Sequence, residues 1–181
     1  MTPKLFWKPA AILATFVLLA PGAFSVSAKT CPLSGPVTER SYHWDFRAEA
    51  SDTFAAVERE AHRVKQHVST LLALARFPGL YSPESHAYEL TVIRDRVNTM
   101  GEEICRLREI QPAISLGQQA RVRQLETALT GLAAVTQAAL DHFNSRDTVR
   151  DLSANSYTSY LDGMYQSARA LSGDTESGHS L

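Results

Sequence analysis

The chain has 181 residues, of which 18 are Lys or Arg and 19 are Asp or Glu, and its formal net charge is −1. Hydrophobic residues make up 44% and charged residues 20%, a globular composition that excludes a disordered or fibrous chain. The near-zero net charge offers no general attraction to nucleic acid or to an anionic membrane surface, so we expect neither as a partner.

Residues 1–28 have the features of a cleaved export signal. Lys4 and Lys8 precede an apolar run, and the segment closes with residues 26–28 ahead of a cut after Ala28. The apolar run is about half the length of a membrane-spanning helix, although an uncleaved anchor is the alternative. We therefore expect a secreted or periplasmic protein with no membrane-spanning segment in the mature chain.

Residues 29–50 are expected to form an extended arm that contains one of the two cysteines. An exported protein meets an oxidising environment, which favours a disulfide between Cys31 and Cys105. Two free thiols or an intermolecular bridge are the alternatives. Trp44 belongs to an aromatic-rich part of the arm, which either anchors a protein interface or covers the end of its own domain.

From residue 51 to residue 172, apolar residues recur at alternating spacings of three and four, which predicts four amphipathic helices. The first helix is expected to start at a cap formed by Ser51 or Asp52 and to stop at Phe77, although its apolar pattern extends back to Phe46. Capping and helix-breaking residues set the expected bounds of the other three helices at Ser82–Pro112, Ser115–Phe143 and Asp147–Leu171.

Four helices of similar length joined by short connections predict an all-α, up-down-up-down four-helix bundle. Each helix is expected to have about 26 to 28 residues and a length of roughly 40 Å. The alternative is a long helical hairpin that completes its core by dimerising, so the protein is expected to be a monomer or a homodimer. Small and polar residues from 173 to 181 predict a disordered tail.

The antiparallel order places His86 and His142 at the same end of two neighbouring helices. His86 falls in the core register, and His142 lies beside Phe143. Two imidazoles on facing helices are suitable ligands for zinc, copper or haem iron, which makes them a candidate metal site. The alternative is that both are ordinary helix-end histidines, one of them favoured there by the helix dipole.

Met100 and Met164 are expected at the same depth in the middle of the bundle, near three glycines. With His62 or a methionine as axial ligand, the space left by the glycines suits a haem. The alternative is that glycine allows close helix packing and methionine fills the gaps. The helix count and the export signal resemble those of exported bundles such as the b-type cytochromes, in architecture only and without a shared motif.

No sequence motif of a zinc protease, a di-iron carboxylate bundle, a phosphate-binding loop or a serine hydrolase is present, so we expect no enzymatic activity. The fourth helix is rich in Ser and Tyr, and Tyr157 and Tyr160 are candidates for an adaptable binding face. We expect an exported, non-enzymatic bundle without a cofactor that binds a protein or a small ligand. The alternative is a haem- or metal-binding electron carrier.

Overall fold

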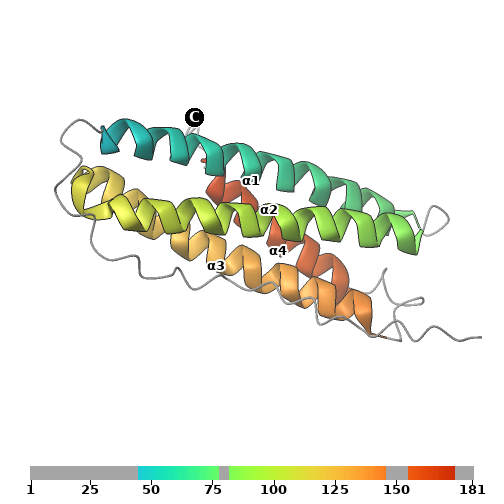
Figure 1. Ribbon diagram of the computed structural model, residues 1–181. Coiled ribbons are helices and arrows are strands. Elements are labelled where there is room, and N and C mark those ends of the chain that lie inside the picture. The colour runs from blue at the N-terminus through green and yellow to red at the C-terminus, as the bar shows by residue number, and fades with distance from the viewer. Residues whose placement is uncertain (1–44, 78–81, 146–154, 174–181) are drawn as a thin grey trace, which may run out of the picture.

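The computed structural model describes residues 45–77, 82–145 and 155–173. Its long helices are α1 (Phe46–Arg76), α2 (Pro83–Ile110), α3 (Leu116–Asn144) and α4 (Asn155–Leu171). Consecutive helices pack antiparallel, and α4 packs against α1, so that the four helices close into a bundle (Figure 1). The predicted all-α four-helix bundle is confirmed.

The first helix begins earlier than the expected cap at Ser51 or Asp52, because Asp45 is its cap. The carboxylate of Asp45 accepts hydrogen bonds from the backbone N–H groups two and three residues later, at 3.0 and 3.1 Å. These bonds satisfy two donors that have no partner within the helix. Residues 46–50 therefore belong to α1, which corrects this part of the arm expected over residues 29–50.

The bounds of α2 and α3 follow the expected capping residues. The hydroxyl of Ser82 accepts from the N–H group of Ser85 at 3.2 Å at the start of α2. Its end is followed by the short helix η2 (Gln111–Ala113), which contains the expected helix-breaking proline. Ser115 and Gln118 then exchange side-chain-to-backbone hydrogen bonds at the start of α3, forming a capping box.

The buried side chains form an apolar stripe on each helix, as the periodicity predicted. His86 is fully buried within this stripe on α2. On α3 the stripe differs slightly from the expected one, because Ala128 and Leu129 are both half-buried while Leu132 is fully buried. The inward direction at this level of α3 therefore passes between Ala128 and Leu129.

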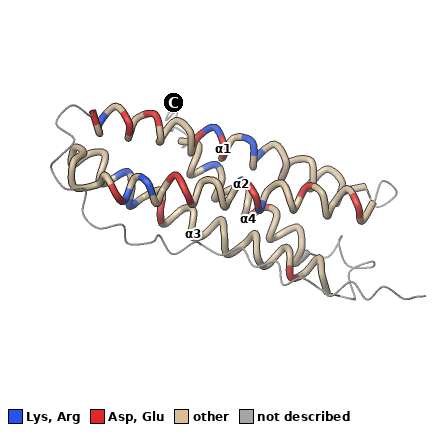
Figure 2. Tube along the Cα trace, viewed as in Figure 1, with Lys and Arg blue, Asp and Glu red and all other residues tan. Residues whose placement is uncertain are grey.

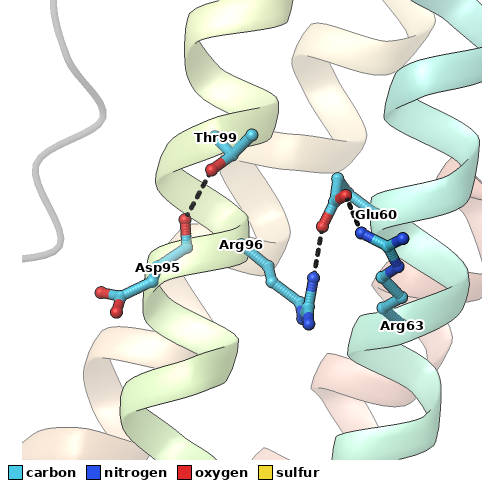
Figure 3. Close-up of polar contacts among 5 residues, drawn as sticks. All are labelled: Glu60, Arg63, Asp95, Arg96 and Thr99. Carbon is cyan, nitrogen blue, oxygen red and sulfur yellow. Dashed lines mark hydrogen bonds and ion pairs between the residues drawn. The ribbon is translucent and has the colours of Figure 1, made fainter.

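Interhelical hydrogen bonds and ion pairs fix the register of α1 against α2. The three pairs, in order along α1, are Glu49–Arg106 at 2.6 Å, Glu60–Arg96 at 2.7 Å and His67–Glu89 at 2.6 Å. The partner positions on α2 fall as those on α1 rise, which is the signature of one antiparallel register. Figure 3 shows the middle pair, in which Glu60 also accepts a hydrogen bond from Arg63 at 2.7 Å.

The last helix ends at Leu171 as expected, and Gly173 follows it with a φ of 73°. This left-handed conformation is common just past a helix end and favours glycine. The expected start of the helix near Asp147 and the expected tail over 174–181 lie outside the described residues. The described part of α4 has 17 residues, whereas α1 has 31.

Several expectations concern residues that the structure does not describe. The export signal over residues 1–28, Cys31 and Trp44 lie outside the described ranges, so cleavage, the disulfide and the role of the tryptophan stay predictions. Cys105, the expected partner of Cys31, is a half-buried residue of α2. Among the helices that the structure does describe, none has a stretch apolar enough to cross a membrane.

Candidate functional site

Five ring-bearing side chains from three helices meet at the end of the bundle where α2 begins and α3 ends. We call them the helix-end cluster: His86 of α2, His142 and Phe143 of α3, and Tyr157 and Tyr160 of α4. The ring of Tyr157 is central, with centroids 6.1 Å from His86 and 5.5 Å from His142. The expected neighbouring histidines are therefore brought together against one aromatic ring.

The cluster is held together by aromatic packing. The rings of His86 and Phe143 are nearly parallel, with centroids 6.5 Å apart, and Tyr160 meets His142 edge-on at 6.1 Å. These separations lie in the range in which aromatic pairs attract each other beyond the effect of burial alone. Through these ring contacts, the last turn of α3 and the first turn of α4 pack against the first turn of α2.

His86 occupies a site that favours its neutral form. Its Nδ1 lies 3.2 Å from the backbone carbonyl oxygen of Ser82, and because a carbonyl can only accept, Nδ1 is assigned as the protonated nitrogen. Burial lowers the pKa of His86, and the hydrogen bond to Ser82 opposes this shift without cancelling it. The positive end of the helix dipole also disfavours an added proton in the first turn of α2.

His142 lies in the last turn of α3 and is partly exposed as a residue, but its Nε2 atom is buried. Among the residues that the structure describes, this nitrogen has no hydrogen-bond partner. A buried polar atom without a partner costs about 1–3 kcal/mol, so a ligand that bonded to this nitrogen would satisfy an unmet interaction.

The two tyrosines differ from the exposed binding face expected for them. Tyr157 is fully buried, and Tyr160 is half-buried against His142. Helical periodicity places Tyr157 in the same stripe as Leu161 and Met164, which are also fully buried. Tyr157 is therefore an interior residue of the helix-end cluster, and only Tyr160 keeps contact with the surface.

The candidate metal site consists of the two imidazoles of His86 and His142. Within the described ranges, no group of three or more His, Cys, Asp or Glu side chains is arranged to hold a metal ion. Among the described residues, a metal site in the helix-end cluster would therefore have only His86 and His142 as ligands of these types.

The structure places the expected haem ligands in different environments. Met100 and Met164 are fully buried in the core, whereas His62 is an exposed residue of α1. The alternative interpretation, in which methionine fills the interior, describes Met100 and Met164 better.

The three glycines near the expected haem level also have different surroundings. A Cβ atom built at Gly101 meets nothing within 4 Å among the residues that the structure describes. At Gly163 it would lie 3.4 Å from Val135, and at Gly131 it would lie 3.8 Å from the hydroxyl of Ser167. Gly131 and Gly163 thus face the contact between α3 and α4, whereas Gly101 does not.

A cavity of about 300 Å³ lies between α1 and α3 at the end of the bundle opposite to the helix-end cluster. Its lining residues are Ser51, Phe54, Ala55, Glu58, Gly117, Gln118 and Arg121. Arg121 pairs with Glu58 and lies over the ring of Phe54, 4.6 Å from its centroid. No local feature of the sequence indicates this cavity, because it depends on where α4 ends: Gly173 lies against Glu58, partway along α1.

Comparisons with protein-family models, with curated proteins and with solved structures find no significant match to this chain. The function is therefore inferred from the surface and the sites of this protein alone.

Proposed function

We propose that this is an exported, non-enzymatic helical-bundle protein that acts by binding a protein or a small ligand. The observation that carries the proposal is the unequal distribution of charge over the bundle. Charged side chains are frequent on the N-terminal half of α1 and along α2, whereas few occur on α4 and on the C-terminal half of α3 (Figure 2).

The uncharged region is defined by exposed small and polar residues, which we call the neutral surface. Its members are Thr127, Thr130, Gly131 and Ala134 of α3 and Ser156, Ser159, Gln166 and Ala170 of α4. Asp141 is the one Asp, Glu, Lys or Arg between residues 127 and 145, and on α4 the exposed Asp162 lies between Ser159 and Gln166, so the neutral surface is low in charge rather than free of it. Half-buried Tyr160 and Tyr165 border this region on α4.

Such a surface suits association with another protein. The centres of protein interfaces are depleted of charged side chains, which are costly to desolvate. Short side chains such as Ala, Ser and Thr also lose little conformational entropy when they are covered. We infer that the partner presents a surface that is similarly low in charge.

The charged residues of α1 and α2 support the absence of a catalytic site on that side. Glu49 and Glu60 of α1 are each held by an arginine of α2, and Glu126 of α3 pairs with Arg108 at 3.1 Å. These ion pairs are accounted for by the alignment of the helices.

For a small ligand, the α1–α3 cavity is the alternative location, and its volume is at the lower end of the range for ligand pockets.

Site-specific photocrosslinking in the native compartment tests the binding surface. A benzophenone side chain introduced at Ala134 of α3 or at Ser159 of α4 is expected to give a crosslinked product with a partner. Asn98, an exposed residue of α2, is the matched control and is expected to give none. Crosslinking at Asn98 that equals crosslinking at the two neutral-surface positions would contradict the proposal.

Metal binding by His86 and His142 is a second candidate function, favoured by the buried Nε2 atom of His142, which has no hydrogen-bond partner within the described ranges. Titration with zinc or copper, followed by calorimetry, should then show binding that is lost in His142→Ala. Equally weak binding in both proteins would leave these residues as helix-end histidines. An absorption spectrum of protein isolated from its native compartment tests the haem form of this alternative through the presence or absence of a Soret band.

A further inference from the structure

The position of the α1–α3 cavity follows from the short length of α4. This helix ends at Leu171, and Gly173 lies against Glu58, partway along α1, so the first turns of α1 extend past the end of α4 (Figure 1). Beyond that point α1 and α3 face each other without a described helix between them. The cavity of about 300 Å³ lies in this part of the bundle, and its volume falls within the range of small-molecule sites.

Arg121 and Glu58 place opposite charges side by side in the lining of this cavity. The Nη2 atom of Arg121 pairs with one oxygen of Glu58, and the two side chains keep exposed fractions of 44% and 33%. A guanidinium has five N–H donors and a carboxylate has two acceptor oxygens, so this one contact leaves both groups able to bond to a ligand as well. The pair connects α1 to α3, whereas the ion pairs that fix the helix register connect α1 to α2.

Phe54 positions the guanidinium of Arg121. The central carbon of this guanidinium lies 4.6 Å from the centroid of the Phe54 ring, which is a cation–π contact. The ring is buried in the core, and the half-buried Ala55 beside it also lines the cavity. The cavity therefore combines a positioned cation, an anion next to it and an apolar wall.

We propose that the α1–α3 cavity binds a small zwitterion of the α-amino acid type, whose carboxylate contacts Arg121 and whose ammonium group contacts Glu58. In such a ligand both charged groups are attached to one carbon atom, which matches the direct contact between the two side chains. The guanidinium suits a carboxylate, because two of its N–H groups can bond to both carboxylate oxygens. A ligand with a single charge would place that charge next to a like charge of the protein.

This inference rests on the small-ligand form of the function proposed above, for which it names the ligand class. The residues that line the cavity do not overlap with those of the neutral surface. Failure of crosslinking at the neutral surface and failure of zwitterion binding in the cavity are therefore separate results.

NMR of the backbone amides of the mature chain, titrated with L-leucine as the probe, tests the site. We expect saturable shifts at Ser51, Ala55, Gly117 and Gln118, which line the cavity, with a Kd of about 1 mM or tighter. The absence of saturable shifts at these residues up to about 10 mM L-leucine would overturn the proposal.

Three analogues of L-leucine test the ligand class on the wild-type protein. Isopentylamine lacks the carboxylate, isocaproate lacks the ammonium group, and ε-aminocaproate is an isomer with the two charged groups at opposite ends of the molecule. Each is expected to bind at least about tenfold more weakly than L-leucine, because each loses one charge-assisted hydrogen bond or cannot form both at once. Equal binding of L-leucine and any one of the three would contradict the α-amino acid class.

Variants of the ion pair test the two contacts. Arg121→Gln and Glu58→Gln each remove one charge and should weaken L-leucine binding at least about tenfold. Glu126→Gln is the matched control, because it removes the ion pair of α3 with Arg108 outside the cavity lining, and it should bind L-leucine as the wild type does. Wild-type affinity in Arg121→Gln or in Glu58→Gln would overturn the proposal.

A steric variant covers the case in which the charge variants do not fold. A Cβ atom at Gly117 meets no described residue within 4 Å, so Gly117→Leu fills part of the cavity without displacing a described residue. This variant should unfold at or above the temperature of the wild type, because leucine has the higher helix propensity. It should bind L-leucine at least about tenfold more weakly, and wild-type affinity in the folded variant would show that the cavity is not the site.

Discussion

Leu132 and Leu116 are leucines of the same helix in opposite environments. Leu132 is fully buried, whereas Leu116, the first residue of α3, has an exposed fraction of 82%. The hydrophobic contribution of a leucine depends on the apolar area that folding removes from water. The same Leu→Ala substitution at these two positions therefore tests which face of α3 is buried.

Leu132→Ala should lower the free energy of unfolding by about 2–5 kcal/mol, because it removes buried apolar surface and leaves a cavity. Leu116→Ala should change it by less than about 0.5 kcal/mol. Urea denaturation of the two variants provides the comparison. Equal stabilities would show that the assigned rotation of α3 is wrong.

His86 makes the stability of the fold depend on pH in one direction. Since burial lowers its pKa in the folded state, the unfolded chain binds more protons below about pH 6.5. The contribution of His86 to the free energy of unfolding should therefore be fully present above about pH 6.5. It should decrease as the pH falls towards the lower pKa that His86 has in the folded state.

Urea titrations at pH 7.5 and pH 5.5 should show a smaller loss of stability in His86→Phe than in the wild type. His62→Gln is the control, because His62 is exposed, and its loss should match that of the wild type. A loss in His86→Phe as large as that of the wild type would mean that other groups account for the acid dependence.

The helices themselves were largely predictable from local signals. Ser82 and Ser115 marked the starts of α2 and α3. Helix caps and helix-breaking prolines affect only the few residues around them, so these starts can be predicted from the local sequence. The start of α1 was missed because Asp45 and Ser51 are both capable caps, and the fold uses the earlier one. Periodicity also placed His86 correctly in the core.

The composition of the sites was harder to predict, because it depends on the rotation of one helix against another. His142 flanks the core stripe of α3, and its contact with Tyr157 arises only when α4 packs alongside. Tyr157 was assigned to the surface from the Ser- and Tyr-rich composition of its helix, although its own spacing places it inside. The α1–α3 cavity has no local signal, because it depends on where a third helix ends.

At the start of α3, Ser115→Ala should lower the free energy of unfolding by about 0.5–2 kcal/mol, because it removes the hydroxyl that accepts from the backbone N–H of Gln118. Ser69→Ala is a matched control within α1, where the hydroxyl of Ser69 only donates back to the carbonyl of Lys65 at 2.8 Å. The control should be neutral or slightly stabilising, because alanine has the higher helix propensity. Similar losses in both variants, measured by thermal unfolding, would contradict the cap assignment.

In the middle of α2, Gly101→Ala should raise the free energy of unfolding by about 0.5–1 kcal/mol, because glycine weakens a helix and the added methyl group meets no described residue within 4 Å. Gly163→Ala should gain less, since its Cβ would contact Val135 at 3.4 Å. Chemical denaturation compares the two. Destabilisation by Gly101→Ala would indicate that the space beside this glycine is occupied in the folded protein.

At the scale of the whole molecule, the two helical hairpins differ in character. The α1–α2 hairpin is registered by interhelical ion pairs and has most of the charged residues, whereas the α3–α4 hairpin has few and presents the neutral surface. The expected disulfide would add a covalent link between Cys31 and α2. In the chain-entropy model, a loop of about 75 residues contributes on the order of 4 kcal/mol.

The central claim, that this protein is an exported binding module, is tested most directly by native mass spectrometry of the protein isolated from its own compartment. We predict the mass of residues 29–181 less two hydrogens, as expected for cleavage after Ala28 and one disulfide, in a complex with a protein partner or a small ligand. A chain that retains residues 1–28 and carries no bound molecule, or one that holds a haem in every copy, would contradict it.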